Sequence, residues 1–60
     1  MNSLTERERE VFDLLCQGMQ SKEVARELGI SPRTVEQHAS HIIEKTGAHN
    51  MLHAATILRG

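Results

Sequence analysis

The sequence has little of the chemistry on which many small domains depend, since it contains one cysteine, one proline, and a single residue among Phe, Tyr and Trp. A single cysteine, Cys16, forms no internal disulfide, which favours an intracellular setting, and we expect it to be a small buried residue of the first helix. The lone aromatic residue, Phe12, provides no platform on which RNA bases stack. These scarcities argue against a disulfide-stapled secreted fold and against RNA recognition.

Long apolar runs are also missing, and no segment approaches the roughly 20 residues that span a bilayer. The amino end lacks the basic and then apolar profile of a signal peptide, so we expect a cytoplasmic protein without membrane contact. A chain of 60 residues forms one domain with a thin core. It leaves little bulk for a pocket of about 300 to 1,000 Å³. No serine, cysteine or carboxylate set stands at catalytic spacing, which argues against an enzyme, a cofactor and a small-molecule substrate.

An excess of positive charge, the usual mark of a nucleic-acid-binding domain, is absent, because the net charge is −1. The distribution is more informative, since residues 1–30 carry −2 and residues 31–60 carry +1. The second half also contains all four histidines, His38, His41, His49 and His53, whose protonation would add positive charge there. A metal site built from them is disfavoured, because structural zinc normally recruits more than one cysteine and Gly47 separates the two pairs.

A series of helix starts and stops is what the sequence does contain. Thr5 followed by Glu8 has the pattern of a capping box, which predicts that a first helix begins here. Gly18 supplies the left-handed residue that ends a helix, so we place the last helical residue near Gln17. The apolar stripe of this helix consists of Val11, Leu14 and Leu15.

A second and a third helix follow, with a short turn between them. The pattern predicts a helix from about Ser21 to Leu28, ended by Gly29. Ser31 is then a helix cap with Pro32 at the first helical position, so the third helix runs from there to about Thr46. Two helices joined by about three residues, with glycine at the turn, form a helix-turn-helix, whose second member enters the major groove of DNA. The buried side of the second helix is predicted to consist of Val24, Ala25 and Leu28.

The third predicted helix has two distinct faces. Its apolar face is formed by Val35, Ala39 and Ile42, with His38 beside them. The opposite face is polar and is the candidate surface for reading DNA; it consists of Glu36, Gln37, Ser40, His41 and Glu44.

A last helix is predicted after Gly47, with Asn50 as its cap and about Leu58 as its end. Apolar side chains circle most of it, and a small bundle covers only one side, so a partner surface is implied. The alternative is a central helix covered entirely by the other three. The apolar residues are Met51, Leu52, Ala54, Ala55, Ile57 and Leu58. We interpret residues 1–3 as a disordered start and residues 4–60 as the domain.

Three blocks of this sequence carry a family resemblance: LTEREREV at 4–11, SKEVARELGIS at 21–31 and PRTVEQH at 32–38. Together they resemble the LuxR-type, or GerE-type, DNA-binding domain, in the order and spacing of that family. The resemblance implies an all-α, four-helix fold whose third helix reads DNA and whose fourth commonly pairs two copies. It also implies the effector end of a response regulator or quorum-sensing regulator, with a sensor or receiver domain outside this chain. The promoter-reading region of sigma factors is a competitor, but His38 and the helix after Gly47 favour the LuxR type.

The resemblance assigns roles to individual residues. The base-contacting positions carry over as Glu36, Gln37 and Ser40, with His41 as a fourth. Residues that flank this surface are expected to contact phosphate: Lys22, Arg33, Thr34, His38 and Lys45. The homodimer interface is expected at Met51, Leu52, Ala55 and Leu58.

The sequence departs from the family where DNA is read. Members commonly carry Lys or Arg among the reading positions, whereas this chain has Glu36, Gln37, Ala39 and Ser40. Fewer basic groups release fewer counterions, so we expect weak binding by a monomer and useful affinity only when two copies engage adjacent half-sites. The alternative is a protein-interaction or dimerisation module in which DNA binding is weakened.

Overall fold

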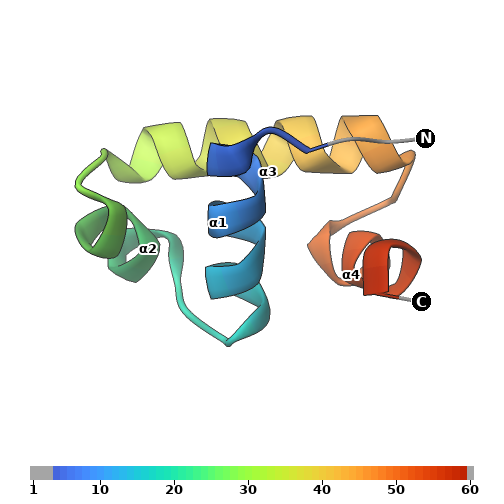
Figure 1. Cartoon of the computed structure of the whole chain (residues 1–60), viewed down its shortest axis with the longest axis horizontal. Helices are drawn as coiled ribbons and strands as arrows, with labels where there is room; N and C mark the ends of the chain where they lie inside the picture. Colours follow the sequence, from blue (N-terminus) through green and yellow to red (C-terminus); the bar gives the residue numbers. More distant parts are fainter. Residues whose placement is uncertain (1–3, 60) are drawn as a thin grey trace.

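The computed structural model describes residues 4–59, which fold into four helices and no strand. They are α1 (Glu6–Cys16), α2 (Ser21–Leu28), α3 (Pro32–Thr46) and α4 (Met51–Arg59). The long helix α3 packs against each of the other three, and α1 descends from it between α2 and α4 (Figure 1). The predicted all-α, four-helix fold is confirmed. None of the helices in residues 4–59 is long and apolar enough to cross a membrane.

The predicted helix starts are confirmed by hydrogen bonds at the caps. The Thr5 N–H donates to Glu8 Oε1 at 2.9 Å while the Glu8 N–H donates to Thr5 Oγ1 at 3.2 Å, which completes the capping box. Ser31 Oγ accepts from the Thr34 N–H at 3.1 Å. Asn50 Oδ1 accepts from the His53 N–H at 2.8 Å. Each cap fixes a helix start from a local signal in the sequence.

The turn between α2 and α3 depends on one left-handed residue. Gly29 has φ +69° and ψ +34°, a conformation that costs a residue with a side chain more than it costs glycine. The chain therefore changes direction within three residues, and the Ile30 N–H donates to the Ala25 carbonyl at 2.9 Å. At the start of α2, the backbone N–H of Gln20 donates to Glu23 Oε1 at 2.8 Å. These bonds set the helix-turn-helix.

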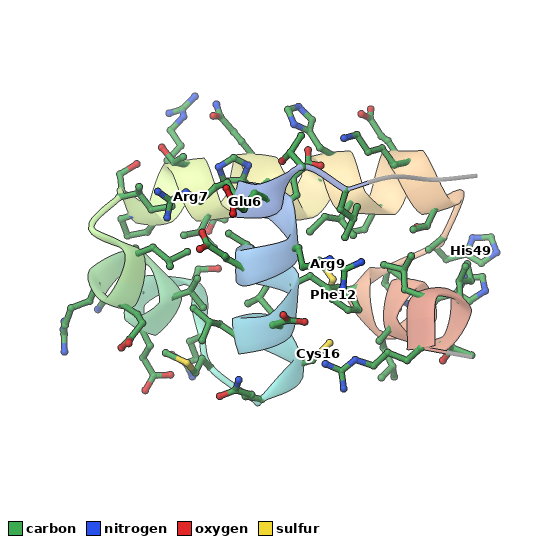
Figure 2. The ribbon with its side chains drawn as sticks, in the orientation of Figure 1. Glu6, Arg7, Arg9, Phe12, Cys16 and His49 are labelled. Atoms are coloured by element: carbon green, nitrogen blue, oxygen red, sulfur yellow. The ribbon has the colours of Figure 1, made fainter. Side chains whose placement is uncertain are left out.

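The core consists of two clusters, one on each side of α1. Val11 packs with Val24 and Ala25 of α2 and Val35 of α3. The second cluster is built from Phe12 of α1, Ile42 of α3 and Ala54 of α4. Phe12 was not among the predicted core residues. It is buried because α1 lies between two helices and so buries two adjacent residues, one toward each neighbour (Figures 1 and 2).

Two expectations need correction. Cys16 was expected to be buried and is exposed, because it lies at the last turn of α1 beside an open groove rather than in either cluster. The alternative in which α4 is covered entirely is also wrong, since the Leu52 and Ile57 side chains remain 79% and 44% exposed. The disordered start predicted for residues 1–3 lies outside the described residues.

Candidate nucleic-acid interface

The outer face of α3 is the polar surface that the sequence predicted. Val35 and Ile42 are fully buried, and His38 and Ala39 are half-buried beside them. Every residue assigned to the opposite face is exposed: Glu36, Gln37, Ser40, His41 and Glu44. Side chains extend from α3 into solvent on the side away from α1 (Figure 2). We call these five residues the outer face of α3.

The outer face offers hydrogen-bonding groups rather than net charge. The Gln37 amide has a donor and an acceptor side by side, which matches the N6 and N7 atoms of adenine in the major groove. Glu36 is a pure acceptor when ionised and matches the amino group of cytosine, while the Ser40 hydroxyl donates or accepts. Such a surface is chemically equipped to discriminate bases.

The residues predicted to contact phosphate lie in different environments. Lys22, near the start of α2, and Arg33, near the start of α3, are exposed cations close to helix amino ends. Thr34 is half-buried, and its hydroxyl lies 2.9 Å from Ser31 Oγ within the cap of α3. His38 is half-buried on the flank of the helix.

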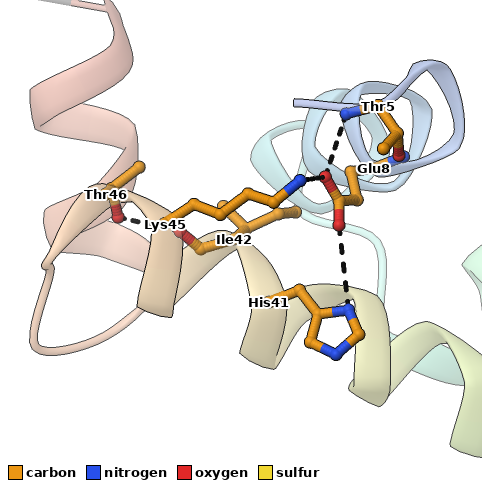
Figure 3. A network of polar contacts seen from close by, with 6 residues as sticks. All are labelled: Thr5, Glu8, His41, Ile42, Lys45 and Thr46. Carbon is orange, nitrogen blue, oxygen red and sulfur yellow. Dashed lines mark hydrogen bonds and ion pairs between the residues drawn. The ribbon is translucent and has the colours of Figure 1, made fainter. Parts of the chain in front are cut away.

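Lys45 and His41 meet a carboxylate that sequence reasoning had assigned only to a helix cap. Lys45 Nζ lies 2.6 Å from Glu8 Oε1, and His41 Nδ1 lies 3.7 Å from Glu8 Oε2 (Figure 3). Glu8 is 4% exposed and is the buried charged residue among those the structure describes. One carboxylate on α1 therefore joins two side chains of α3 that are one helical turn apart.

The environment of Glu8 favours its charged form. The hydrogen bond from Lys45, followed by the hydrogen bond from the Thr5 N–H, lowers the pKa of Glu8 below its ordinary value of 4.5, although burial opposes the shift. Sequence reasoning missed this network because the partners are 37 positions apart and no local pattern connects them.

The solvent side of α4 exposes two large apolar side chains, Leu52 and Ile57, beside the polar Thr56 and Arg59. Three of the four residues predicted for a dimer interface, Met51, Leu52 and Ala55, line a groove of about 420 Å³ together with Leu15, Cys16 and Arg59. The fourth, Leu58, packs against the cluster of Phe12, Ile42 and Ala54. Figure 2 shows Cys16 on the side of α1 that faces α4.

The two remaining histidines stack at the start of α4. Their rings are 5.1 Å apart between centroids at an interplanar angle of 16°, and the His49 N–H donates to His53 Nδ1 at 3.1 Å. Within residues 4–59, the structure brings together no group of three or more potential metal ligands. The histidines therefore divide between α3 and the start of α4.

Comparison with known proteins shows similarity to one family of bacterial regulators, both through a family profile and through individual relatives. The profile described as "Bacterial regulatory proteins, luxR family" matches residues 2–58. The chain is 53% identical over 47 residues to the transcriptional regulatory protein UhpA of Escherichia coli, which covers 78% of this chain and 24% of UhpA. It is 54% identical over 44 residues to the spore germination protein GerE of Bacillus subtilis, covering 73% of this chain and 60% of GerE.

A third relative is the transcriptional regulatory protein FixJ of Rhizobium meliloti, which is 40% identical over 53 residues. That match covers 88% of this chain and 26% of FixJ. The chain thus spans about a quarter of the length of UhpA and FixJ and less than two thirds of GerE.

Proposed function

The chain belongs to the luxR family of bacterial regulatory proteins, and from that premise we propose that it reads duplex DNA with α3 in the major groove and pairs with a second copy through α4. It is the DNA-binding domain of a transcriptional regulator and not an enzyme. The observation that carries the proposal is the outer face of α3, which is exposed over its whole length while the opposite side of the helix is buried.

Base recognition in this proposal belongs to Glu36, Gln37 and Ser40, with His41 at the margin. These side chains lie on one face of α3 along about two helical turns, a length that suits the major groove. A bidentate contact between Gln37 and adenine would contribute most, because it fixes two atoms of one base edge at once.

Phosphate contacts position α3 without reading sequence. We assign them to two exposed cations near helix amino ends, to two half-buried residues in the first half of α3, and to a lysine near its carboxyl end: Lys22 and Arg33, Thr34 and His38, and Lys45. Lys45 is the weakest member of this set, because its ammonium group already lies 2.6 Å from Glu8. The outer face itself contains Glu36 and Glu44, so phosphate attraction is modest and base contacts carry a large share of binding.

Pairing through α4 would cover the apolar residues that this domain leaves in solvent. Leu52 is 79% exposed and lies beside the groove that Met51 and Ala55 also line. Exposed apolar area of this kind is stabilised by contact with a second surface. Leu58 packs against Phe12, Ile42 and Ala54 and so holds α4 against the rest of the domain. Two paired copies would place two α3 helices on half-sites about one helical turn apart.

The regulator would act in the cytoplasm, together with a sensor or receiver domain outside this chain. The support is that UhpA and FixJ are both named as transcriptional regulatory proteins and are about four times longer than the region that matches this chain. In such an arrangement the additional domain would control whether two α4 surfaces meet.

Selection of bound duplexes from a random DNA pool tests the proposal. We expect enrichment of two related half-sites with centres about 10 base pairs apart. A pool that shows no enriched sequence after several rounds would contradict base reading by α3. Enrichment of a single half-site would keep the reading function and remove the pairing through α4.

A second candidate function is a protein-interaction module with weakened DNA binding. It is favoured by the net charge of −1 and by the two glutamates on the outer face of α3. Salt separates the two candidates, because binding through phosphates weakens steeply as salt rises. Duplex association that is absent at about 50 mM salt would favour the interaction module.

A further inference from the structure

Glu8 is the one charged side chain that residues 4–59 bury, and it contacts His41 of the outer face of α3 and Lys45, one helical turn further along. Its Oε1 accepts from Lys45 Nζ at 2.6 Å and from the Thr5 N–H at 2.9 Å, while Oε2 lies 3.7 Å from His41 Nδ1 (Figure 3). The Lys45 and His41 side chains are 36% and 58% exposed, so both reach solvent beside the surface assigned to DNA.

Carboxylate and phosphate oxygens bind the same groups, an ammonium and an imidazole N–H. The Glu8 carboxylate therefore binds the Lys45 ammonium group in the way that a phosphate of bound DNA would. Together Glu8 and Lys45 have no net charge at neutral pH, and only a net cation releases counterions when it approaches DNA. The carboxyl end of α3 thus gains little attraction for DNA from its lysine.

From this geometry we infer that Glu8 is a specificity-determining residue that acts through Lys45 and His41: it withholds the Lys45 ammonium and the His41 ring from phosphates and lowers sequence-independent binding to duplex DNA. The inference rests on the proposed function. Glu8 contacts no DNA itself, so it is a positioning residue. Because Glu8 weakens the phosphate contacts, the base contacts of Gln37 and Ser40 contribute a larger share of the total affinity for DNA.

The competition between Glu8 and phosphate favours Glu8 for two reasons. The ion pair is already formed within the fold, so no further ordering is required, whereas a phosphate must be brought from solution. Release of Lys45 would also leave a buried carboxylate with less compensation, and removing one partner of a buried ion pair is strongly destabilising.

The test compares three variants on a duplex of random sequence, all at the same pH of about 8. Glu8→Gln removes the charge and keeps the capping box, since glutamine also serves at that position. Glu6→Gln is the matched control, because Glu6 is exposed on the first turn of the same helix. The double variant Glu8→Gln with Lys45→Gln removes both charges and keeps the net charge of the wild type.

The readout is the slope of log affinity against log salt, measured by fluorescence anisotropy between about 50 and 200 mM salt. We expect Glu8→Gln to steepen the slope by about 0.9 and to raise affinity roughly tenfold at the lowest salt. Glu6→Gln and the double variant should keep the wild-type slope. A purely structural role for Glu8 would lower affinity and leave the slope unchanged.

Equal slopes for Glu8→Gln and Glu6→Gln would overturn the inference while leaving the proposed function intact. If Glu8→Gln does not fold, which circular dichroism detects, the double variant decides alone. Its slope should equal that of the wild type, and a slope shallower by about 0.9 would mean that Lys45 binds phosphate in the native protein. A wild-type chain that binds no duplex at low salt would overturn the proposed function itself, and the inference with it.

Discussion

The helices α3 and α4 each present one face to solvent, and the two faces differ in chemistry, because the face of α3 is polar whereas that of α4 exposes large apolar side chains. Over its 15 residues, α3 separates a buried apolar side from a fully polar outer face. Over its nine residues, α4 buries only Ala54 and leaves Leu52 and Ile57 exposed. The face of α3 is therefore stable in water and able to offer hydrogen bonds, whereas the face of α4 gains free energy when another surface covers it.

The largest expected effect is the loss of stability when the packing between α3 and α4 is disrupted. Ile42→Ala removes a fully buried side chain of α3 from the cluster that contains Phe12 and Ala54, so the free energy of unfolding should fall by about 2 to 5 kcal/mol. Urea denaturation followed by circular dichroism measures the loss. Leu52→Ala on exposed α4 is the control and should change stability by no more than about 0.5 kcal/mol. Equal losses of stability in the Ile42→Ala and Leu52→Ala variants would mean that Ile42 is not part of the core.

The next effect tests whether the apolar face of α4 meets a second copy. Leu52→Glu places a charge on the exposed side of α4, and we expect affinity for a duplex with two half-sites to fall about 100-fold through lost pairing. Sedimentation should show the variant as a monomer. Affinity for a duplex with a single half-site is the control and should stay the same. A variant that still pairs would exclude Leu52 from the interface.

A smaller effect tests the outer face of α3. Gln37→Ala should cost about 1 to 3 kcal/mol on the selected duplex and relax the preference at one base position. Gln17→Ala is the matched control, because Gln17 is an exposed glutamine at the end of α1, away from α3. Anisotropy titrations of the selected duplex and of single-base variants give both quantities. Unchanged preference at every position would remove Gln37 from the reading set.

The smallest effect concerns the stability of the fold in acid, where the ion pair between Glu8 of α1 and Lys45 of α3 is lost. Glu8 has a pKa below its ordinary value of 4.5 because Lys45 and the Thr5 N–H bind its charged form. Its contribution to stability is therefore complete above about that pH and is lost as pH falls through the lowered pKa. Urea denaturation between neutral pH and pH 3 should show the wild type losing more stability than Glu8→Gln. Parallel losses would contradict a stabilising role for the charged carboxylate.

Local signals in the sequence predicted most of the fold. The caps at Thr5, Ser31 and Asn50 and the turn at Gly29 each depend on residues within four positions, so a linear pattern contains them. The same holds for the exposed face of α3, because helical periodicity alone separates it from Val35 and Ile42.

What the sequence did not predict depends on how helices pack. The burial of Phe12 follows from the position of α1 between two neighbours, and a single apolar stripe does not represent that arrangement. The exposure of Cys16 follows from the groove beside α4. The pairing of Glu8 with Lys45 connects α1 to α3 across 37 positions, so only the folded chain reveals that a capping residue also pairs with a lysine beside the outer face of α3.

Titration of the isotope-labelled chain with its selected duplex, followed by backbone amide shifts in NMR spectra, tests the central claim most directly. The largest changes should fall on the amides of Glu36, Gln37 and Ser40, with smaller changes at the start of α2 and along α4, where the two copies are proposed to pair. Changes concentrated on α4, with α3 unaffected by the duplex, would contradict the assignment of α3 as the helix that reads DNA.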